Sequence, residues 1–209
     1  MKFIINQNLP KDIPFDYQYL VSKLDSYKYP RDKISLMLKN HEIIRVKKGL
    51  YIVSEDYDGN VDKNLIANLI YGPSYVSLDS ALSYWGLIPE RVIQISSVTN
   101  RKNKEFDTPK GNYSYRYQNN AVVSVGVERI KAKGYFFLIA SKEKALLDKI
   151  ATTKKLEPQL DFRSLIEEDF RIDMDEFEDM DSEKINNLSK YYRKRSVIGF
   201  ASWYKKEYS

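Results

Sequence analysis

The chain has 209 residues, enough for one or two domains. Its formal net charge is +5, with 43% hydrophobic and 30% charged residues, as in an ordinary globular protein. It has no cysteine and one histidine, His41, which excludes disulfides, thiolate metal sites and histidine-rich zinc or iron sites. The apolar run at its start is too short for a signal peptide, and no stretch approaches the ~20 apolar residues of a membrane span. We therefore expect a soluble, cytoplasmic protein with no membrane contact.

Charge is unevenly distributed along the chain. Residues 1–53, 101–134 and 185–209 carry ten, eight and six Lys or Arg against five, three and one Asp or Glu, so each has a net charge of +5. Residues 157–184 carry three Lys or Arg against twelve Asp or Glu, a net charge of −9. This pattern indicates two kinds of partner surface, or solvated faces without specific roles. The acidic segment either binds a basic partner or balances the basic C-terminus within the same fold.

The front of the chain predicts two helices followed by a hairpin. Apolar residues at helical spacing predict a helix over about 17–24, and Pro30 separates it from a second helix that ends near residue 40. Apolar, β-branched runs on either side of a Lys-Lys-Gly turn predict a tight hairpin over 43–53. This order of elements predicts a minimal winged helix-turn-helix between Asp16 and Val53.

A second unit is predicted to follow. Helical spacing places helices near 65–70 and 78–85, the second with Ser77 as its N-cap, and Ser141 caps a further helix. Strand patterns lie between them, at 75–76, 92–98, 113–117, 122–127 and 135–139. The end of the chain is helical and charged. The predicted fold class is α+β: a winged helix-turn-helix domain over 1–58, then a mixed domain over 59–209 with a mainly antiparallel sheet and a helical tail.

No motif points to catalysis. Ser141 and Lys144 match the Ser-x-x-Lys signature of penicillin-binding enzymes, but the partner motifs are missing and an N-cap role accounts for the serine. Residues 56–59 lack the spacing of a calcium loop. A metal nuclease needs clustered carboxylates with a lysine, and the nearest approach, 128–131, lacks a partner aspartate. Phosphate-binding glycine loops and nucleophilic dyads are also missing, so we expect neither enzyme activity nor a cofactor.

The second predicted helix carries side chains suited to DNA. A winged helix places this helix in the major groove and its hairpin over the flanking backbone or minor groove. With its apolar stripe turned inward, the helix leaves Arg31, Lys33 and Ser35 near its N-terminal end. An arginine there can contact a guanine edge, while the lysine and serine suit phosphates.

The hairpin adds three cations within four residues, Arg45, Lys47 and Lys48. Such a cluster contributes salt-sensitive affinity more than specificity. These three residues and the three on the helix are the predicted DNA-binding site, with promoter DNA as the partner. Because similar units also bind proteins, a protein-interaction module remains an alternative. A metal-dependent nuclease or other defence enzyme that docks on nucleic acid through the winged helix is another.

Three stretches carry a family resemblance. They are residues 43–51 (IIRVKKGLY), residues 75–89 with YVSLDSAL and WGLIP, and residues 140–148 (ASKEKALLD). In this order, and over about residues 16–150, they resemble the AbiEi family of antitoxins and predicted transcriptional regulators of type IV toxin–antitoxin and phage-defence systems.

The resemblance implies an N-terminal winged helix that binds promoter DNA and represses its own operon, with Arg45, Lys47 and Lys48 as the family's basic wing. It also implies a larger C-terminal domain that counters a nucleotidyltransferase-like toxin. The second and third stretches match that domain, where their residues indicate capped packing helices. The acidic segment beyond Glu157 departs from the family pattern.

Overall fold

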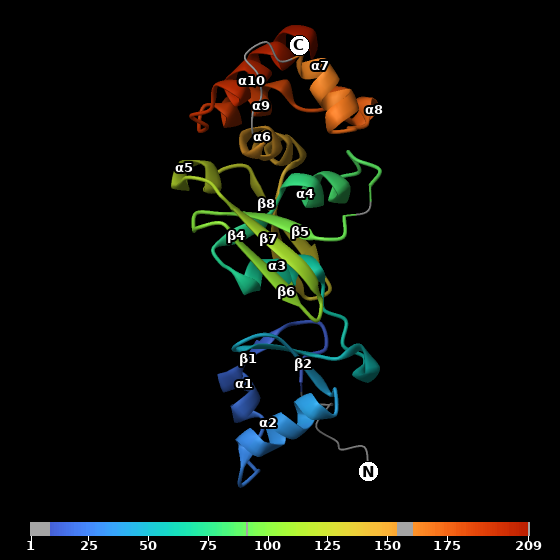
Figure 1. The fold of residues 1–209 in the computed structure, drawn as a ribbon, viewed down its shortest axis with the longest axis vertical. Helices are drawn as coiled ribbons and strands as arrows, with labels where there is room; N and C mark the ends of the chain where they lie inside the picture. The colour runs from blue at the N-terminus through green and yellow to red at the C-terminus, as the bar shows by residue number, and fades with distance from the viewer. Residues whose placement is uncertain (1–8, 91, 154–160, 209) are drawn as a thin grey trace.

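The computed structural model describes residues 9–90, 92–153 and 161–208. They form an elongated α+β molecule, with an N-terminal unit at one end, a larger sheet in the middle and a group of helices at the other end (Figure 1). Among these residues, no helix has both the length and the apolar character needed to cross a membrane.

The N-terminal unit contains the two helices and the hairpin expected from the sequence. Its elements are β1 (Phe15–Asp16), α1 (Tyr17–Ser22), α2 (Pro30–Lys39), β2 (Ile43–Lys47) and β3 (Leu50–Val53). The strands form an antiparallel sheet in the order β1-β3-β2. Asp16 begins α1 by accepting a hydrogen bond from the N–H of Tyr19, and Pro30 occupies the first turn of α2, where its missing N–H costs nothing.

The hairpin belongs to two hydrophobic cores. One core fills the N-terminal unit and includes Leu20, Ile34 and Met37 of the helices. The other face of the hairpin contributes Val46, Leu50 and Ile52 to the core of the larger unit. Apolar packing therefore continues past the predicted boundary between residues 58 and 59, and the hairpin is fixed against the larger unit.

The connection after the hairpin is a compact turn. It contains a 3-10 turn, η2 (Glu55–Tyr57), followed by Asp58 with a φ of 64°. Gly59 then passes so close to β3 that a Cβ atom built on it would lie 2.1 Å from the carbonyl oxygen of Val53. Only glycine fits there. The stretch that superficially suggests a calcium loop is thus a turn that joins the units.

The larger unit is built on a six-stranded mixed sheet in the order β6-β7-β5-β4-β9-β8. The pairs β4–β9 and β5–β7 are parallel, and the other three pairs are antiparallel. Helix α3 contacts β4, β5 and β9, while α4 and α6 pack together between the sheet and the C-terminal helices (Figure 1). Its elements are α3 (Lys63–Ile70), β4 (Ser74–Val76), α4 (Leu78–Tyr84), β5 (Ile95–Thr99), β6 (Lys104–Thr108), β7 (Gly111–Tyr117), α5 (Asn120–Val123), β8 (Val127–Ala132), β9 (Tyr135–Ala140) and α6 (Lys142–Thr152).

Three details of the sheet differ from the sequence prediction. The strand predicted over 92–98 begins only at Ile95, the first residue of β5. The strand predicted over 122–127 is wrong: α5 occupies the first two of these residues, because Asn119 caps it by accepting from the N–H of Val122, and the strand β8 begins only at Val127. The sequence does not predict the edge strand β6. This strand pairs with β7 along its whole length, although Phe106 is its single large apolar residue.

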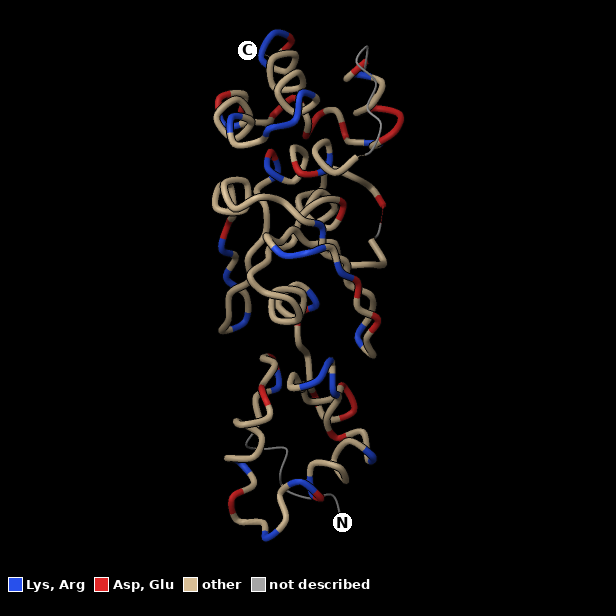
Figure 2. Tube along the Cα trace, turned by 60° about the vertical axis from the view of Figure 1, so that its left-hand side comes forward, with Lys and Arg blue, Asp and Glu red and all other residues tan. Residues whose placement is uncertain are grey.

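The C-terminal end is helical, as expected. It consists of α7 (Phe162–Ser164), a π-helical turn η3 (Leu165–Asp169), α8 (Met174–Glu178), α9 (Ser182–Ser189) and α10 (Arg195–Tyr208). Aromatic rings of α8 and α10 pack on one another, for example Phe177 and Tyr204 at 5.1 Å between centroids. Residues 161–184 carry eleven Asp or Glu against three Lys or Arg. Much of this end is therefore acidic (Figure 2), while the first residues of the predicted acidic segment, 157–160, lie outside the described residues.

Candidate nucleic-acid interface

Helix α2 has one buried and one exposed face. Ile34 and Met37 are buried in the core of the N-terminal unit. Arg31 and Ser35 are exposed on the opposite side, and the Ser35 hydroxyl donates a hydrogen bond of 3.1 Å to the Arg31 carbonyl oxygen. Among the described residues, the Arg31 guanidinium has no hydrogen bond or ion pair, so its donors face solvent.

The predicted phosphate contact by Lys33 does not agree with the position of that residue. Lys33 is only 9% exposed. Its ammonium lies 5.7 Å from the centre of the Tyr27 ring, so the side chain packs against the body of the unit. The structure therefore brings Arg31 and Ser35 together on one face of α2 but does not place Lys33 with them.

The hairpin presents two of its three cations. Arg45 and Lys48 are exposed, and neither side chain has an ion pair within the described part of the chain. A bulge between Arg45 and Lys47 shifts the pairing with β3 just before the turn. Gly49 closes the turn with a φ of 85°, a conformation that glycine adopts without strain.

Lys47, the third cation of the predicted wing, has an internal partner. Its ammonium donates a short hydrogen bond to the carbonyl oxygen of Ile70, the last residue of α3. The C-terminus of a helix carries a partial negative charge, which this ammonium complements. Burial lowers the pKa of Lys47, and the nearby charges of Lys104 and Arg101 lower it further. Lys47 therefore anchors the hairpin to the larger unit.

The larger unit adds cations next to the hairpin that no sequence motif indicates. Arg101 and Lys104 are exposed and lie 5.5 and 5.6 Å from the centre of the Tyr71 ring. Lys104 also lies 5.0 Å from the ring of Phe106. Because Lys47 bonds to the carbonyl oxygen of Ile70, the residue before Tyr71, these two cations lie close to the hairpin. The basic charge of residues 101–134 is the sequence signal for them, although it does not indicate where in the fold they lie.

A buried ion pair lies on α6, in the stretch that resembles a Ser-x-x-Lys motif. The ammonium of Lys144 is 2.9 Å from a carboxylate oxygen of Asp148, and both side chains are 0% exposed. The hydroxyl of Tyr192 joins the pair at 2.7 Å from the ammonium and 2.6 Å from the same carboxylate oxygen. Burial lowers the pKa of Lys144 and raises that of Tyr192 well above its usual value.

The other carboxylate oxygen of Asp148 accepts hydrogen bonds from Tyr75 and Ser77, at 2.9 and 2.8 Å. Ser77 does stand at the N-cap position of α4, as predicted, but its hydroxyl serves Asp148 and makes no cap bond. Ser141 does cap α6, by accepting from the N–H of Lys144. Because the whole network is buried, its geometry is that of a structural core which joins the sheet, α6 and the chain after α9.

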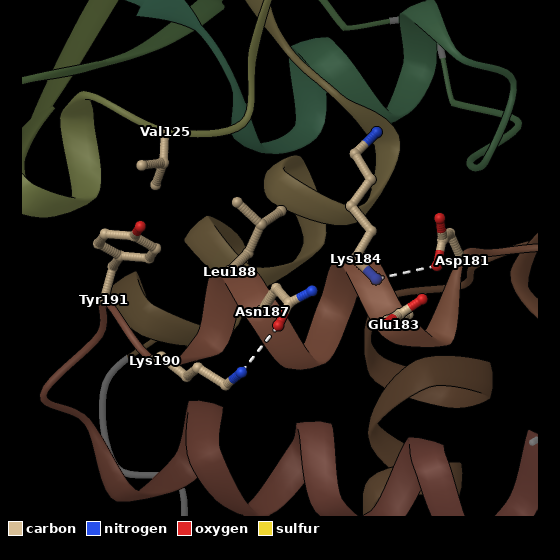
Figure 3. A pocket seen from close by; sticks show the side chains of 8 residues that line it. All are labelled: Val125, Asp181, Glu183, Lys184, Asn187, Leu188, Lys190 and Tyr191. Atoms are coloured by element: carbon tan, nitrogen blue, oxygen red, sulfur yellow. Dashed lines mark hydrogen bonds between the residues drawn. The ribbon is translucent and has the colours of Figure 1, made fainter.

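A cleft of about 630 Å³ runs beside α9 (Figure 3). Its lining mixes both signs of charge with apolar groups, and the cations already have partners. Lys184 lies 2.8 Å from Glu143 and 3.5 Å from Glu128, and Lys190 donates to the side-chain oxygen of Asn187 at 2.7 Å. The cleft therefore does not have the character of an anion site.

Two further observations bear on the class of protein. No group of three or more His, Asp or Glu side chains is arranged to hold a metal ion within the described residues. Comparison of the chain with protein-family models and with curated proteins finds no match. The geometry itself defines an α+β protein in which a helix–helix–hairpin unit presents unpaired cations and is fixed to a larger unit with a helical, acidic end.

Proposed function

We propose that this chain is a DNA-binding transcriptional regulator which represses its own operon through its N-terminal unit. The observation that carries the proposal is the exposure of Arg31, Arg45 and Lys48 on the second helix and the following hairpin of one small unit. None of the three has an ion pair with the described residues. Helix, helix and hairpin follow one another in the order of a minimal winged helix, so α2 would enter the major groove and the hairpin would lie over the backbone.

The charge distribution along the molecule supports an end-on position of DNA. Lys47 of the hairpin bonds to the carbonyl oxygen of Ile70, and Arg101 and Lys104 lie over the ring of the next residue, Tyr71. Arg101 and Lys104 therefore extend the basic surface beyond the N-terminal unit. The helical end, with its excess of carboxylates, lies at the opposite end of the molecule (Figure 2). A polyanion is attracted to the first region more than to the helical end, where residues 161–208 carry twelve Asp or Glu against nine Lys or Arg.

We further propose that the protein acts in the cytoplasm, without enzyme activity of its own, as the antitoxin of a type IV toxin–antitoxin system. The resemblance of residues 16–150 to AbiEi antitoxins supports this part, and it makes a nucleotidyltransferase-like toxin the protein partner. Co-expression tests it: the chain restores growth to cells that express the toxin from the adjacent gene. Continued growth arrest would contradict the antitoxin role and leave the DNA-binding role standing.

A mobility-shift titration with the DNA upstream of the gene tests the DNA-binding role. Arg45→Ala/Lys48→Ala removes two exposed cations from the hairpin and is expected to weaken binding at least tenfold, because fewer neutralised phosphates mean less favourable counterion release. Lys205→Ala/Lys206→Ala removes two cations from α10 and is the matched control, expected to bind like the wild type. Equal affinity of the hairpin variant and the wild type would defeat the assignment.

A further inference from the structure

Helix α2 exposes one large apolar residue on its otherwise polar face. Leu36 is 46% exposed, whereas Ile34 and Met37, its apolar neighbours on the helix, are 4% and 1% exposed. The residues one turn before and almost one turn after it, Asp32 and Lys39, are exposed as well. Leu36 therefore lies on the solvent-facing side of α2, about 100° around the helix axis from the buried Met37.

This face is the one that would enter the major groove if the proposed function is correct, and the inference rests on that function. The major groove offers one apolar group, the C5-methyl of thymine, which apolar side chains contact. The other exposed residues of α2 are polar or charged and suit hydrogen-bonding groups of bases and phosphates. Leu36 is the apolar side chain on this surface that matches the apolar group of the groove.

Position along the helix relates Leu36 to Arg31. Five residues separate them, which corresponds to about 7.5 Å along the axis of an α-helix. Five residues also turn the helix by about 140°, so Arg31 and Leu36 lie on opposite flanks of its exposed face and would meet different parts of the groove. Arg31, near the N-terminal end of α2, has the free guanidinium that bidentate contact with guanine needs.

We propose that Leu36 is a specificity-determining residue that reads thymine through its methyl group, at a different base pair from the guanine contacted by Arg31. The side chain buries its exposed surface against the methyl group when α2 enters the groove. Cytosine lacks the methyl group and presents a polar amino group at the neighbouring position of the groove, so it leaves Leu36 without an apolar partner.

The test compares two forms of the same upstream DNA, one made with thymine and one in which uracil replaces thymine throughout. Uracil lacks only the methyl group, so pairing and phosphates are unchanged. Wild-type protein is expected to bind the uracil form about fourfold more weakly for each methyl group that Leu36 covers in the thymine form. Leu36→Ala is expected to bind both forms equally, at the level of wild type on uracil DNA. Alanine suits a helix, so α2 is retained.

Leu69→Ala is the matched control. Leu69 is 43% exposed on α3 in the larger unit, and the variant is expected to keep the wild-type preference for thymine DNA. Equal binding of both DNA forms by the wild type would overturn the reading of thymine by Leu36 while leaving DNA binding intact. If Leu36→Ala kept the full preference for thymine DNA, another residue would be responsible for that preference, and the reading of thymine by Leu36 would also be overturned. Absence of binding to either form would overturn the proposed function itself.

Discussion

At the scale of single residues, two buried polar groups differ sharply in how they are satisfied. The hydroxyl of Tyr115 on β7 donates to the carbonyl oxygen of Ala67 at 2.6 Å. The hydroxyl of Tyr113, on the same face of the strand, is buried and has no hydrogen-bond partner among the described residues. A buried hydroxyl without a partner costs about 1–3 kcal/mol. The sequence predicts a strand over residues 113–117 but does not distinguish the two tyrosines.

Tyr113→Phe is therefore expected to raise the free energy of unfolding at pH 7 by about 1 kcal/mol. Burial also raises the pKa of Tyr113, so the unfolded chain loses this proton near pH 10 while the folded chain keeps it. Folded wild type thus loses stability as the pH rises above about 10, and the advantage of Tyr113→Phe grows there.

Urea unfolding at pH 7 and at about pH 10.5 measures the gain in stability and its growth with pH, since the two values lie on either side of the usual tyrosine pKa of about 10. Tyr115→Phe is the control, and it is expected to lower stability at pH 7 because it leaves the Ala67 carbonyl without its donor. A loss of stability in Tyr113→Phe at pH 7 would show that the hydroxyl has a partner.

The buried pair of Lys144 and Asp148 gives a second prediction at this scale. Lys144→Met leaves a buried carboxylate without its cation and is expected to lower the free energy of unfolding by about 3–5 kcal/mol. Lys144→Met/Asp148→Asn is expected to recover part of that loss, since it removes the unpaired charge. Arg163 and Glu167 form an exposed pair of the same spacing, and Arg163→Met is expected to change little. Equal losses in the free energy of unfolding for Lys144→Met and Arg163→Met would contradict the conclusion that the stabilisation by the buried network depends on its burial.

At the scale of elements, the β2–β3 hairpin joins the N-terminal unit to the larger unit. It supplies apolar residues to both cores, and Lys47 holds it to the end of α3. Lys47→Ala is expected to lower the free energy of unfolding by about 1 kcal/mol, because the carbonyl oxygen of Ile70 loses a charged donor. Lys48→Ala, next in the chain and exposed, is expected to stay within about 0.5 kcal/mol of wild type in the same thermal unfolding measurement. Equal stability of the two variants would show that Lys47 is a surface cation after all.

Local patterns predict most elements of this fold, and pairing at a distance explains the exceptions. Helices α1 and α6 have side-chain caps and apolar spacing within a few residues, α2 has Pro30 in its first turn, and the hairpin has its glycine turn. β6 has little strand character of its own and becomes a strand by pairing with β7. The valine-rich run after Asn119 indicates a strand, but the cap formed by Asn119 favours a short helix instead.

The candidate interface also depends on contacts between residues far apart in the chain, which local sequence patterns do not predict. The sequence identifies Arg31, Arg45 and Lys48 as cations on the correct elements, and the structure places them at the surface. The sequence does not reveal that Lys47 meets the carbonyl of Ile70, which lies 23 residues away in the chain. Nor does it place Arg101 and Lys104 beside the hairpin, because that depends on the packing of one unit against the other.

At the scale of the whole molecule, charges of both signs occur at both ends (Figure 2). Residues 161–208 at the helical end carry twelve Asp or Glu against nine Lys or Arg, whereas the candidate interface gathers exposed cations without ion pairs to the described residues, such as Arg31, Arg45 and Lys48. The packing of the β2–β3 hairpin into the larger core couples the position of the proposed DNA-binding surface to the rest of the molecule.

The salt dependence of DNA binding tests the central claim most directly. The affinity of the wild type for the upstream DNA is expected to fall steeply with salt, with a slope of log K against log salt of about −0.9 for each phosphate contacted. Arg45→Ala/Lys48→Ala should reduce the magnitude of that slope by about two. Lys205→Ala/Lys206→Ala, at the other end of the molecule, should leave it unchanged. An unchanged slope in the hairpin variant would contradict phosphate contacts at the hairpin and, with them, the proposed mode of DNA binding.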